Sequence, residues 1–191
     1  NWDVESVAPA KMYQSWGISA FIVKFRVPVG YWSPKAYLQD IQRAIGMART
    51  RYGMRLVGIH GACFGGRAAM EASNVLKLSY EPVDESDSPD FRPDFTVLLY
   101  PQGGLSLPGR PKVIPPVFGA VSRDDNCAGY IPAEMYVQNC RYRGVATELH
   151  IYPTGMHGWG TCEFYPFLQN ESECNWPKEL RAFLQTINVL P

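Results

Sequence analysis

A short apolar run that turns directly into a helix constrains the fold of this chain more than any other feature. The run at 56–59 predicts a buried strand, and helix-forming residues follow at 67–72. The turn between them carries the pattern Gly-x-Cys-x-Gly. A strand that turns so sharply into a helix needs small residues on both sides of the turn, and we expect Gly61 and Gly65 to supply them. The residue at the apex, Cys63, is predicted to be strained and exposed at the start of the helix.

This arrangement is the nucleophile-elbow pattern, with Cys63 at the position where the usual motif has serine. A thiol at a helix N-terminus feels the positive end of the helix dipole, which favours the reactive thiolate. The backbone N–H of Phe64 would then point at the oxyanion of a tetrahedral intermediate. The alternative is that Cys63 is a small buried residue in one of the many glycine-rich turns that join a strand to a helix.

Helices and apolar strands alternate along the whole chain. This alternation is typical of an α/β fold in which a mostly parallel sheet is covered by helices on both faces. The length of 191 residues suits a single domain with a proper core, spanning residues 1–191. The periodicity predicts helices at 4–15, 33–51, 67–78, 132–143 and 176–188, and strands at 18–25, 56–59, 95–100, 116–121 and 147–152.

Residues with reactive side chains follow three of the predicted strands. Cys63 follows the second strand, Asp124 and Asp125 follow the fourth, and His157 follows the fifth. In parallel sheets, reactive groups sit in loops beyond the carboxyl ends of the strands. A nucleophile, an acid and a base therefore occur in that chain order, each just past a strand end.

The histidines and the tryptophan near these loops have ordinary structural interpretations as well. His157 could be a loop histidine that bonds to the backbone, with its flanking glycines acting only as turn formers. His60 and His150 lack a position beyond a strand end, so we expect them to pack or to lie at the surface. Trp159 could line an acyl pocket or be an ordinary packed aromatic.

On these residues the chain resembles the α/β-hydrolases, in particular the esterase/lipase-like branch that includes acetyl esterases. Asp124-Asp125 is similar to the acid loop of that family, and His157-Gly158-Trp159-Gly160 is similar to its histidine loop. The elbow at Cys63 resembles that of dienelactone hydrolases, which use cysteine. The similarity covers almost the whole chain.

The resemblance implies a carboxylic-ester hydrolase that acts on a small ester substrate without a metal or an organic cofactor. Cys63 would attack the ester carbonyl and form an acyl-enzyme, and His157 would take the thiol proton and then activate water. Asp125 would orient the imidazole, with Asp124 as the second candidate because adjacent carboxylates often divide between catalysis and turn capping. The alternative is a catalytically inactive member of the fold that serves as a structural or interaction subunit.

By the family pattern, the predicted strand at 18–25 would be the fourth of eight. The three strands before it, and the His-Gly-Gly-type loop that supplies a second oxyanion donor, are then not in this sequence. The remaining strands would leave an apolar sheet edge unpaired, which natural proteins avoid. We therefore expect a second polypeptide, the N-terminal part of the same precursor, to complete the sheet. Without that donor this chain should be nearly inactive, because one donor contributes about 10²–10³ in rate.

Charge and motif content argue against several other classes of function. Lysine plus arginine and aspartate plus glutamate both number 18, which argues against nucleic acid or an anionic membrane as the main partner. No apolar run reaches membrane-spanning length, and no CxxC or HExxH motif suggests a metal site. The acidic cluster at 84–87 lacks the glycine and distal glutamate of a calcium loop, so we expect a solvated loop there.

Five cysteines and one glycosylation motif bear on the compartment. Cys127, Cys140, Cys162 and Cys174 could form two disulfides in any of three pairings and leave Cys63 free. A bridge at Cys127 would either hold the acid loop or pull its carboxylate out of reach. Asn170 begins an Asn-x-Ser acceptor for N-glycosylation. Together these features predict a secreted or lumenal protein, the alternative being free thiols in a reducing compartment with a chance motif.

Overall fold

The computed structural model describes residues 2–27, 35–87, 90–103, 114–165 and 171–191. Within these residues, four parallel strands form one sheet in the order β1-β2-β3-β4. The strands are β1 (Gly58–Ala62), β2 (Phe95–Leu99), β3 (Val117–Ser122) and β4 (Thr147–Tyr152). The α/β class and the parallel sheet predicted from the sequence are therefore confirmed.

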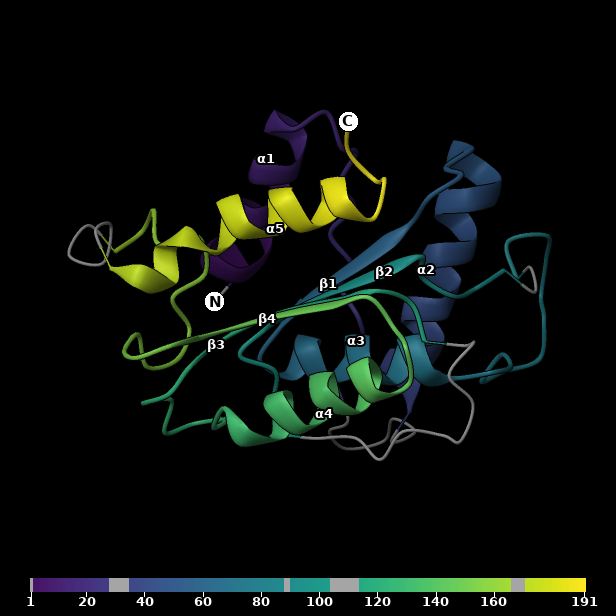
Figure 1. The fold of residues 1–191 in the computed structure, drawn as a ribbon. Coiled ribbons are helices and arrows are strands. Elements are labelled where there is room, and N and C mark those ends of the chain that lie inside the picture. Colours follow the sequence, from purple (N-terminus) through teal and green to yellow (C-terminus); the bar gives the residue numbers. More distant parts are fainter. Residues whose placement is uncertain (1, 28–34, 88–89, 104–113, 166–170) are drawn as a thin grey trace.

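Helices cover both faces of this sheet, as Figure 1 shows. A π-helix, η1 (Asp3–Val7), leads into α1 (Ala8–Ser15), and α1 lies on the same face as α5 (Trp176–Thr186), which follows the short 3-10 helix η4 (Ser172–Asn175). The opposite face carries α3 (Phe64–Asn74) and α4 (Ile131–Tyr142), and α2 (Ala36–Tyr52) packs against α3. No helix in the described part of the chain is long and apolar enough to cross a membrane.

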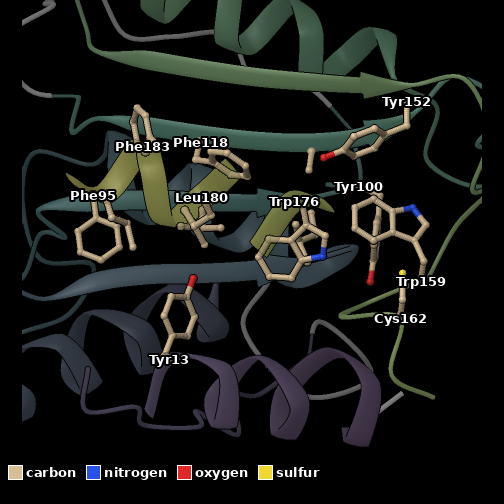
Figure 2. Packing of buried hydrophobic residues seen from close by; sticks show 14 residues of the cluster. Tyr13, Phe95, Tyr100, Phe118, Tyr152, Trp159, Cys162, Trp176, Leu180 and Phe183 are labelled. Carbon is tan, nitrogen blue, oxygen red and sulfur yellow. The ribbon is translucent and has the colours of Figure 1, made fainter. Parts of the chain in front are cut away.

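The strand residues point alternately to two separate cores, as a pleated strand requires. Val97 and Leu99 of β2 face α1 and α5, where they join a cluster that includes Phe118, Trp176 and Leu180 (Figure 2). Leu98, between them in the sequence, faces α3 and α4 and packs with Met70 and Tyr136. Because β2 and β3 are buried on both faces, their sequences are mostly apolar and do not alternate between polar and apolar residues.

Helix ends follow the expected capping residues in most places. Gly53, with a left-handed φ of 66°, ends α2, and Pro132 stands in the first turn of α4. The helix after the elbow is shorter than predicted and ends at Asn74, because Val75 adopts an extended conformation. Ser33, the residue predicted to begin the helix before the elbow, lies outside the described residues.

The strand predicted at 18–25 is wrong in the described structure. Residues 18–27 have no regular secondary structure and form no strand with any described neighbour. Phe21, Ile22 and Val23 are 49%, 40% and 37% exposed, although their pattern is that of a buried strand. A strand needs a partner to satisfy its backbone groups, and the described residues place none beside this segment.

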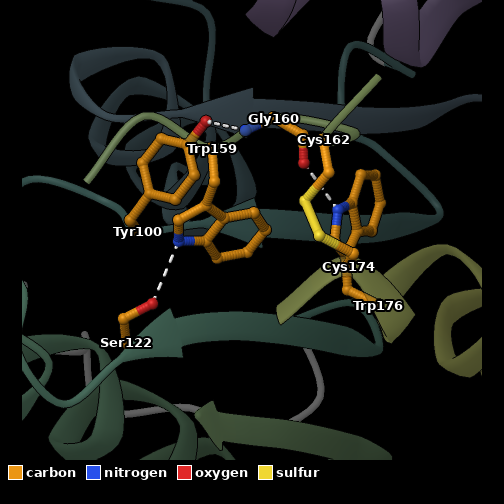
Figure 3. The surroundings of a disulfide bond; sticks show 7 residues. All are labelled: Tyr100, Ser122, Trp159, Gly160, Cys162, Cys174 and Trp176. Carbon is orange, nitrogen blue, oxygen red and sulfur yellow. Dashed lines mark hydrogen bonds between the residues drawn. A yellow bond between two sulfur atoms is a disulfide. The ribbon is translucent and has the colours of Figure 1, made fainter. Parts of the chain in front are cut away.

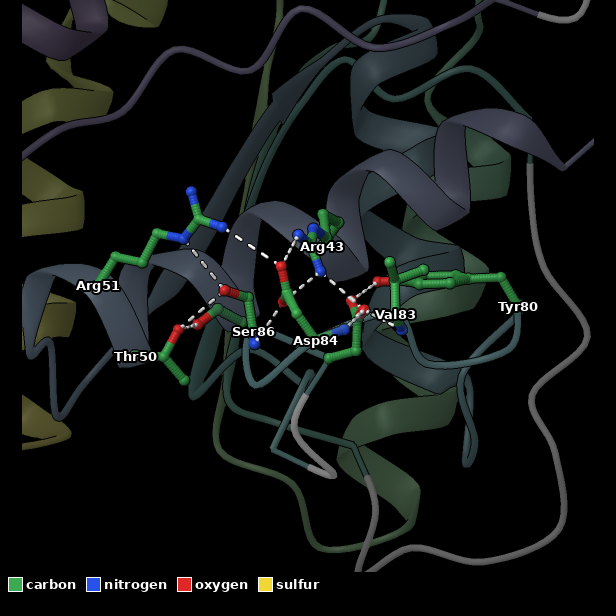
Figure 4. Close-up of polar contacts among 9 residues, drawn as sticks. Arg43, Thr50, Arg51, Tyr80, Val83, Asp84 and Ser86 are labelled. Atoms are coloured by element: carbon green, nitrogen blue, oxygen red, sulfur yellow. Dashed lines mark hydrogen bonds and ion pairs between the residues drawn. The ribbon is translucent and has the colours of Figure 1, made fainter.

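The acidic cluster at 84–87 forms ion pairs with the side chain of Arg43 in α2. Both carboxylate oxygens of Asp84 accept hydrogen bonds from Arg43, at 2.7 and 2.6 Å, as Figure 4 shows. Asp87, whose side chain is fully buried, also pairs with Arg43 at 2.7 Å and accepts a hydrogen bond from Tyr80. Hydrogen bonds from Arg43 lower the pKa of Asp84 to about 2. Asp84 is exposed as predicted, but the expectation of a solvated loop is wrong at Asp87.

Candidate functional site

Cys63 occupies a strained turn between β1 and α3. Its backbone has φ 52° and ψ −122°, a conformation that a residue with a side chain rarely adopts. Such strain costs about 1–3 kcal/mol and persists only where neighbours enforce it. Here the N–H of Cys63 donates to the carbonyl of Leu99 at 3.1 Å, and its own carbonyl accepts from Gly66 at 3.0 Å and Gln102 at 2.9 Å. The elbow predicted from the sequence is thus built by hydrogen bonds to the end of β2 and to the loop that follows it.

Two glycines make the turn possible, and one of them differs from the prediction. A Cβ on Gly61 would lie 2.2 Å from the carbonyl oxygen of Gly65, and a Cβ on Gly66 would lie 2.7 Å from the Cβ of Pro101. A Cβ on Gly65 would meet nothing within 4 Å. The expectation that Gly65 must be small is therefore wrong, because the close approach of helix to strand falls one residue later.

The surroundings of the Cys63 thiol favour its neutral form. Burial raises the pKa of Cys63, and the nearby carboxylates of Glu5 and Asp125 raise it further. A hydrogen bond from the backbone N–H of Phe64 acts in the opposite direction without overcoming burial. Burial therefore opposes the predicted effect of the helix N-terminus, and the half-buried thiol needs a base to become a nucleophile. The same contact places the N–H of Phe64 next to the sulfur, and its role as an oxyanion donor stays a prediction.

His157 and Asp125 meet as the sequence predicted. Nδ1 of His157 lies 2.8 Å from Oδ2 of Asp125, whose side chain is fully buried. Because an ionised carboxylate can only accept, the ring nitrogen Nδ1 carries the hydrogen. The backbone N–H groups of Cys127 and Ala128 donate to the other oxygen, Oδ1, at 2.8 and 2.9 Å. The long acid loop therefore holds the carboxylate in place and does not draw it away.

The structure separates the two adjacent aspartates. Asp124 is exposed and accepts a hydrogen bond from the backbone N–H of Met156 at 2.8 Å, so it ties the histidine loop to the acid loop. Asp125 points the other way, at the imidazole. Asp125 is therefore the partner of His157. Asp124 instead holds the loop backbone, the structural role expected for an aspartate next to the acid.

Nε2 of His157 is buried and has no hydrogen-bond partner within the described residues. With Nδ1 protonated, Nε2 is the ring nitrogen that can accept a proton. It makes no hydrogen bond to the sulfur of Cys63 in this state, a looseness that is common in unliganded catalytic sites.

Tyr100 links the elbow to the histidine loop, and the sequence analysis missed it. Its ring centroid lies 4.7 Å from that of His157, and its hydroxyl accepts a hydrogen bond from the N–H of Gly160 at 3.1 Å. Burial raises the pKa of Tyr100, and the charges of Glu5 and Cys63 contribute to the same shift. Cys63 and His157 therefore share a neighbour at one edge of the sheet. Its position just past the end of β2 is the signal that could have identified it.

The histidine loop rests on buried polar contacts and one disulfide, as Figure 3 shows. Nε1 of Trp159 donates to Oγ of Ser122 at 3.0 Å, and Nε1 of Trp176 donates to the carbonyl of Gly160 at 2.7 Å. Trp159 is only 1% exposed, so it is a packed aromatic and does not line an open pocket.

The disulfide joins Cys162 to Cys174. Cys127 is exposed and Cys140 is buried, and both are free thiols. The prediction of a second disulfide among these four cysteines is therefore wrong. The glycosylation candidate Asn170 lies outside the described residues.

The other two histidines make packing and polar contacts outside the pair formed by His157 and Asp125, as expected. Nδ1 of His60 is 3.0 Å from the hydroxyl of Tyr13, and burial lowers the pKa of His60 to about 4. His150 pairs with Glu148 and Glu179 at 2.6 and 3.2 Å. In the part of the chain that the structure describes, no three His, Cys, Asp or Glu side chains group as a metal site would require.

The arrangement of these strands and helices is similar to that of several solved structures. An α/β-hydrolase enzyme from a Medee basin deep-sea metagenome library superposes with a TM-score of 0.71 over 95% of this chain and 77% of its own, at 16% identity. This chain has the α/β-hydrolase fold. Another similar structure is that of the acetyl ester-xyloside bifunctional hydrolase from Caldicellulosiruptor lactoaceticus, with a TM-score of 0.79, 22% identity and coverage of 96% of this chain and 77% of that one.

A carboxylesterase from Lactobacillus plantarum matches 98% of this chain and 81% of its own, at 18% identity and a TM-score of 0.75. Identities this low establish the α/β-hydrolase fold and leave the activity to be argued from the site. No protein-family model matches the sequence, and no curated protein is significantly similar to it.

Proposed function

We propose that this chain is a carboxylic-ester hydrolase in which Cys63 is the nucleophile, His157 the base and Asp125 the orienting acid. The contact of 2.8 Å between Nδ1 of His157 and Asp125 carries the proposal, because it leaves Nε2 as the buried proton acceptor. The strained backbone of Cys63 and the position of Tyr100 between Cys63 and His157 support it. The solved structures named above as a carboxylesterase and an acetyl ester hydrolase have the same fold.

The proposed reaction uses side chains of this chain and water. The sulfur of Cys63 forms a bond to the ester carbonyl carbon while Nε2 of His157 takes the thiol proton. The carbon–oxygen bond to the alcohol then breaks, and the alcohol leaves with the proton from His157. Water, deprotonated by Nε2 of His157, then attacks the thioester carbonyl carbon. The carbon–sulfur bond breaks, the carboxylic acid is released, and the thiolate of Cys63 takes back the proton from His157. Asp125 stabilises the imidazolium that forms in each half of the cycle.

The backbone N–H of Phe64 supplies one donor to the oxyanion in this proposal. The second donor would come from a further polypeptide segment that completes the sheet, so the chain alone should react about 10²–10³ more slowly than a complete site.

Acylation by p-nitrophenyl acetate, followed by intact-protein mass spectrometry, tests the proposal without requiring turnover. We expect one acetyl group on Cys63, none on Cys63→Ala and far less on His157→Gln. Cys127→Ser is the matched control, because its exposed thiol is the competing site and its removal should leave the acetylation of Cys63 unchanged. Treatment with the same ester should also protect Cys63 from alkylation by iodoacetamide. Acetylation only of Cys127, or equal acetylation with and without His157, would contradict the assignment.

A catalytically inactive subunit is the second candidate. The raised pKa of Cys63 and the lack of a hydrogen bond between it and His157 favour this role. An inactive subunit would keep its fold and its thiol but gain no acetyl group on Cys63 at any pH tested.

We also propose that the protein is secreted or lumenal. The disulfide between Cys162 and Cys174 supports an oxidising compartment. Thiol counting after denaturation, on protein purified from its natural source with alkylated thiols, should find these two cysteines oxidised. Five free thiols would place the protein in a reducing compartment.

A further inference from the structure

A carboxyl group is buried in η4, directly behind the histidine loop. Glu173 is 0% exposed, and neither of its side-chain oxygens has a hydrogen-bond partner in another residue among those described. An ionised carboxylate needs hydrogen bonds or a positive charge when it is buried, whereas the neutral acid is much less costly to bury. The surroundings of Glu173 therefore suit a neutral carboxyl group.

This carboxyl group packs against the turn that opens the histidine loop. A Cβ on Gly155 would lie 3.0 Å from Cδ of Glu173 and 2.5 Å from Oγ of Ser122. Gly155 also has a φ of 128°, which residues with a side chain rarely adopt. Glu173 and Ser122 thus leave room for a glycine and no more, and the loop starts in direct contact with the carboxyl group.

The histidine loop is strained beyond this turn. Met156 has a φ of 55° and Cys162 a φ of 62°, although both carry side chains. Such conformations persist only where the surrounding structure enforces them. The N–H of Met156 donates to Asp124 and the N–H of Gly160 donates to Tyr100, so the loop is held from outside. The imidazole in the middle of the loop keeps its place only as long as this support lasts.

A displacement of η4 would be transmitted to the loop. The residue after Glu173 is Cys174, and the disulfide joins it to Cys162 of the loop (Figure 3). Nε1 of Trp176 donates to the carbonyl of Gly160 at 2.7 Å and forms a second link. Any movement that brings the carboxyl group of Glu173 to water therefore moves the histidine loop as well.

The groups around this carboxyl disfavour its ionisation. Burial raises the pKa of Glu173, and the negative charges of Glu171 in the same segment and of Asp124 in the acid loop raise it further. Its own backbone N–H acts in the opposite direction without overcoming burial. On the side of β4, burial and Glu179 raise the pKa of Tyr152, and the charge of Glu173 adds to that shift. In the described part of the chain, the charges that act on Glu173 are negative.

We propose that Glu173 is a positioning residue for His157: its neutral carboxyl group supports the histidine loop, and its ionisation releases the loop. The carboxylate would need water, so η4 and the loop would separate and the imidazole would lose its contact with Asp125. Nε2 could then no longer take the proton of Cys63. The inference rests on the proposed role of His157 as the base, but the position of the loop can be measured without any ester chemistry.

Rising pH favours the released loop. In the released form the carboxyl would titrate near the ordinary glutamate pKa of about 4.3, whereas in the held form it keeps its proton to higher pH. Between these two pKa values the released form binds fewer protons, so the ratio of held to released loop falls by up to about tenfold for each pH unit. Above the raised pKa of the held form, the ratio becomes constant.

Hydrogen exchange between about pH 5 and pH 8 tests the inference. The amides of Met156 and Gly160 report on the loop, and their protection is measured relative to the exchange rate of an unfolded chain at the same pH. In the original chain we expect this protection to fall by up to about tenfold per pH unit. In Glu173→Gln, which keeps the shape of the side chain but cannot ionise, it should stay constant. Glu171→Gln is the matched control, because it removes an exposed carboxylate two residues earlier and should keep the fall.

Protection that is independent of pH in the original chain would overturn the proposal, and so would an equal fall in the original chain and in Glu173→Gln. The NMR signal of the side-chain carboxyl carbon of Glu173 provides a measurement that needs no variant. It should titrate over the pH range in which the loop loses its protection, and titration in a separate range would also overturn the proposal.

Acetylation of Cys63 separates this proposal from that of the ester hydrolase. If both hold, the acetylation rate of Glu173→Gln relative to that of the original chain should rise with pH, by up to about tenfold per pH unit. Loss of loop protection without acetylation at any pH would contradict the ester hydrolase proposal alone. Acetylation together with loop protection that does not depend on pH would contradict the role of Glu173 alone.

Discussion

Replacing Gly66 with alanine should destabilise the fold through the contact between α3 and the loop after β2. The new Cβ would lie 2.7 Å from the Cβ of Pro101, 2.9 Å from its Cα and 3.1 Å from the carbonyl oxygen of Gly61. None of these atoms ends a flexible side chain, so the backbone itself must move. Overpacking of this kind costs up to about 3 kcal/mol, and alanine returns about 1 kcal/mol of helix propensity. The net loss is about 2 kcal/mol, which lowers the Tm by about 4–8 °C in a chain of this length.

Gly65→Ala is the matched control, one residue earlier in the same helix. Its Cβ would meet nothing within 4 Å, so only the gain in helix propensity remains. We expect Gly65→Ala to leave the free energy of unfolding unchanged or to raise it by up to about 1 kcal/mol.

Urea unfolding followed by far-UV circular dichroism measures both variants, with unchanged m-values as the check that the midpoints report stability. A Gly65→Ala variant as unstable as Gly66→Ala, or a Gly66→Ala variant as stable as the original chain, would refute the reasoning about the elbow.

Three further predictions concern the disulfide, the arginine–carboxylate loop and the acid of the site. The double variant Cys162→Ser/Cys174→Ser opens a loop of 12 residues and should lose about 3 kcal/mol, so a reductant should lower the Tm of the original chain to that of the variant and leave the variant unchanged. Hydrogen bonds from Arg43 depress the pKa of Asp84 to about 2, so their stabilising effect is complete above the unfolded pKa near about 4 and is lost as the pH falls through about 2. The Tm difference between the original chain and Arg43→Gln should therefore shrink between about pH 4 and pH 2, and a constant difference would contradict this origin. Asp125→Asn should lower ester hydrolysis by about 10³–10⁴, as loss of the correct imidazole tautomer does, whereas Asp124→Asn should lower it less than about tenfold. Equal losses in initial-rate assays would mean that the two carboxylates are not divided as their contacts indicate.

Much of the candidate site could be predicted because its residues follow strand ends, and strand ends are visible in the sequence. Cys63, Asp125 and His157 each come after a predicted strand, and parallel strands bring their carboxyl ends to one edge. Tyr100 follows the same rule after β2 but was missed, because an aromatic residue beyond a strand does not by itself suggest chemistry.

Choices between neighbouring residues could not be predicted. Asp124 and Asp125 are chemically identical, and only the path of the acid loop directs one to the Met156 backbone and the other to His157. Gly65 and Gly66 are likewise equal in the sequence, and the position of Pro101 decides which one cannot be replaced. The direction in which the pKa of Cys63 shifts also depends on burial and on carboxylates that are distant in the chain.

The sequence by itself determined the helices, the mostly parallel sheet and the chain order of thiol, carboxylate and imidazole. Helices and turns depend on contacts between residues close in the chain, so their residues specify them locally. The tertiary structure alone decided which cysteines pair, which aspartate meets the imidazole and whether 18–27 becomes a strand. Each of these depends on a partner far away in the chain. Segment 18–27 has no strand partner among the described residues, so it is not a strand there.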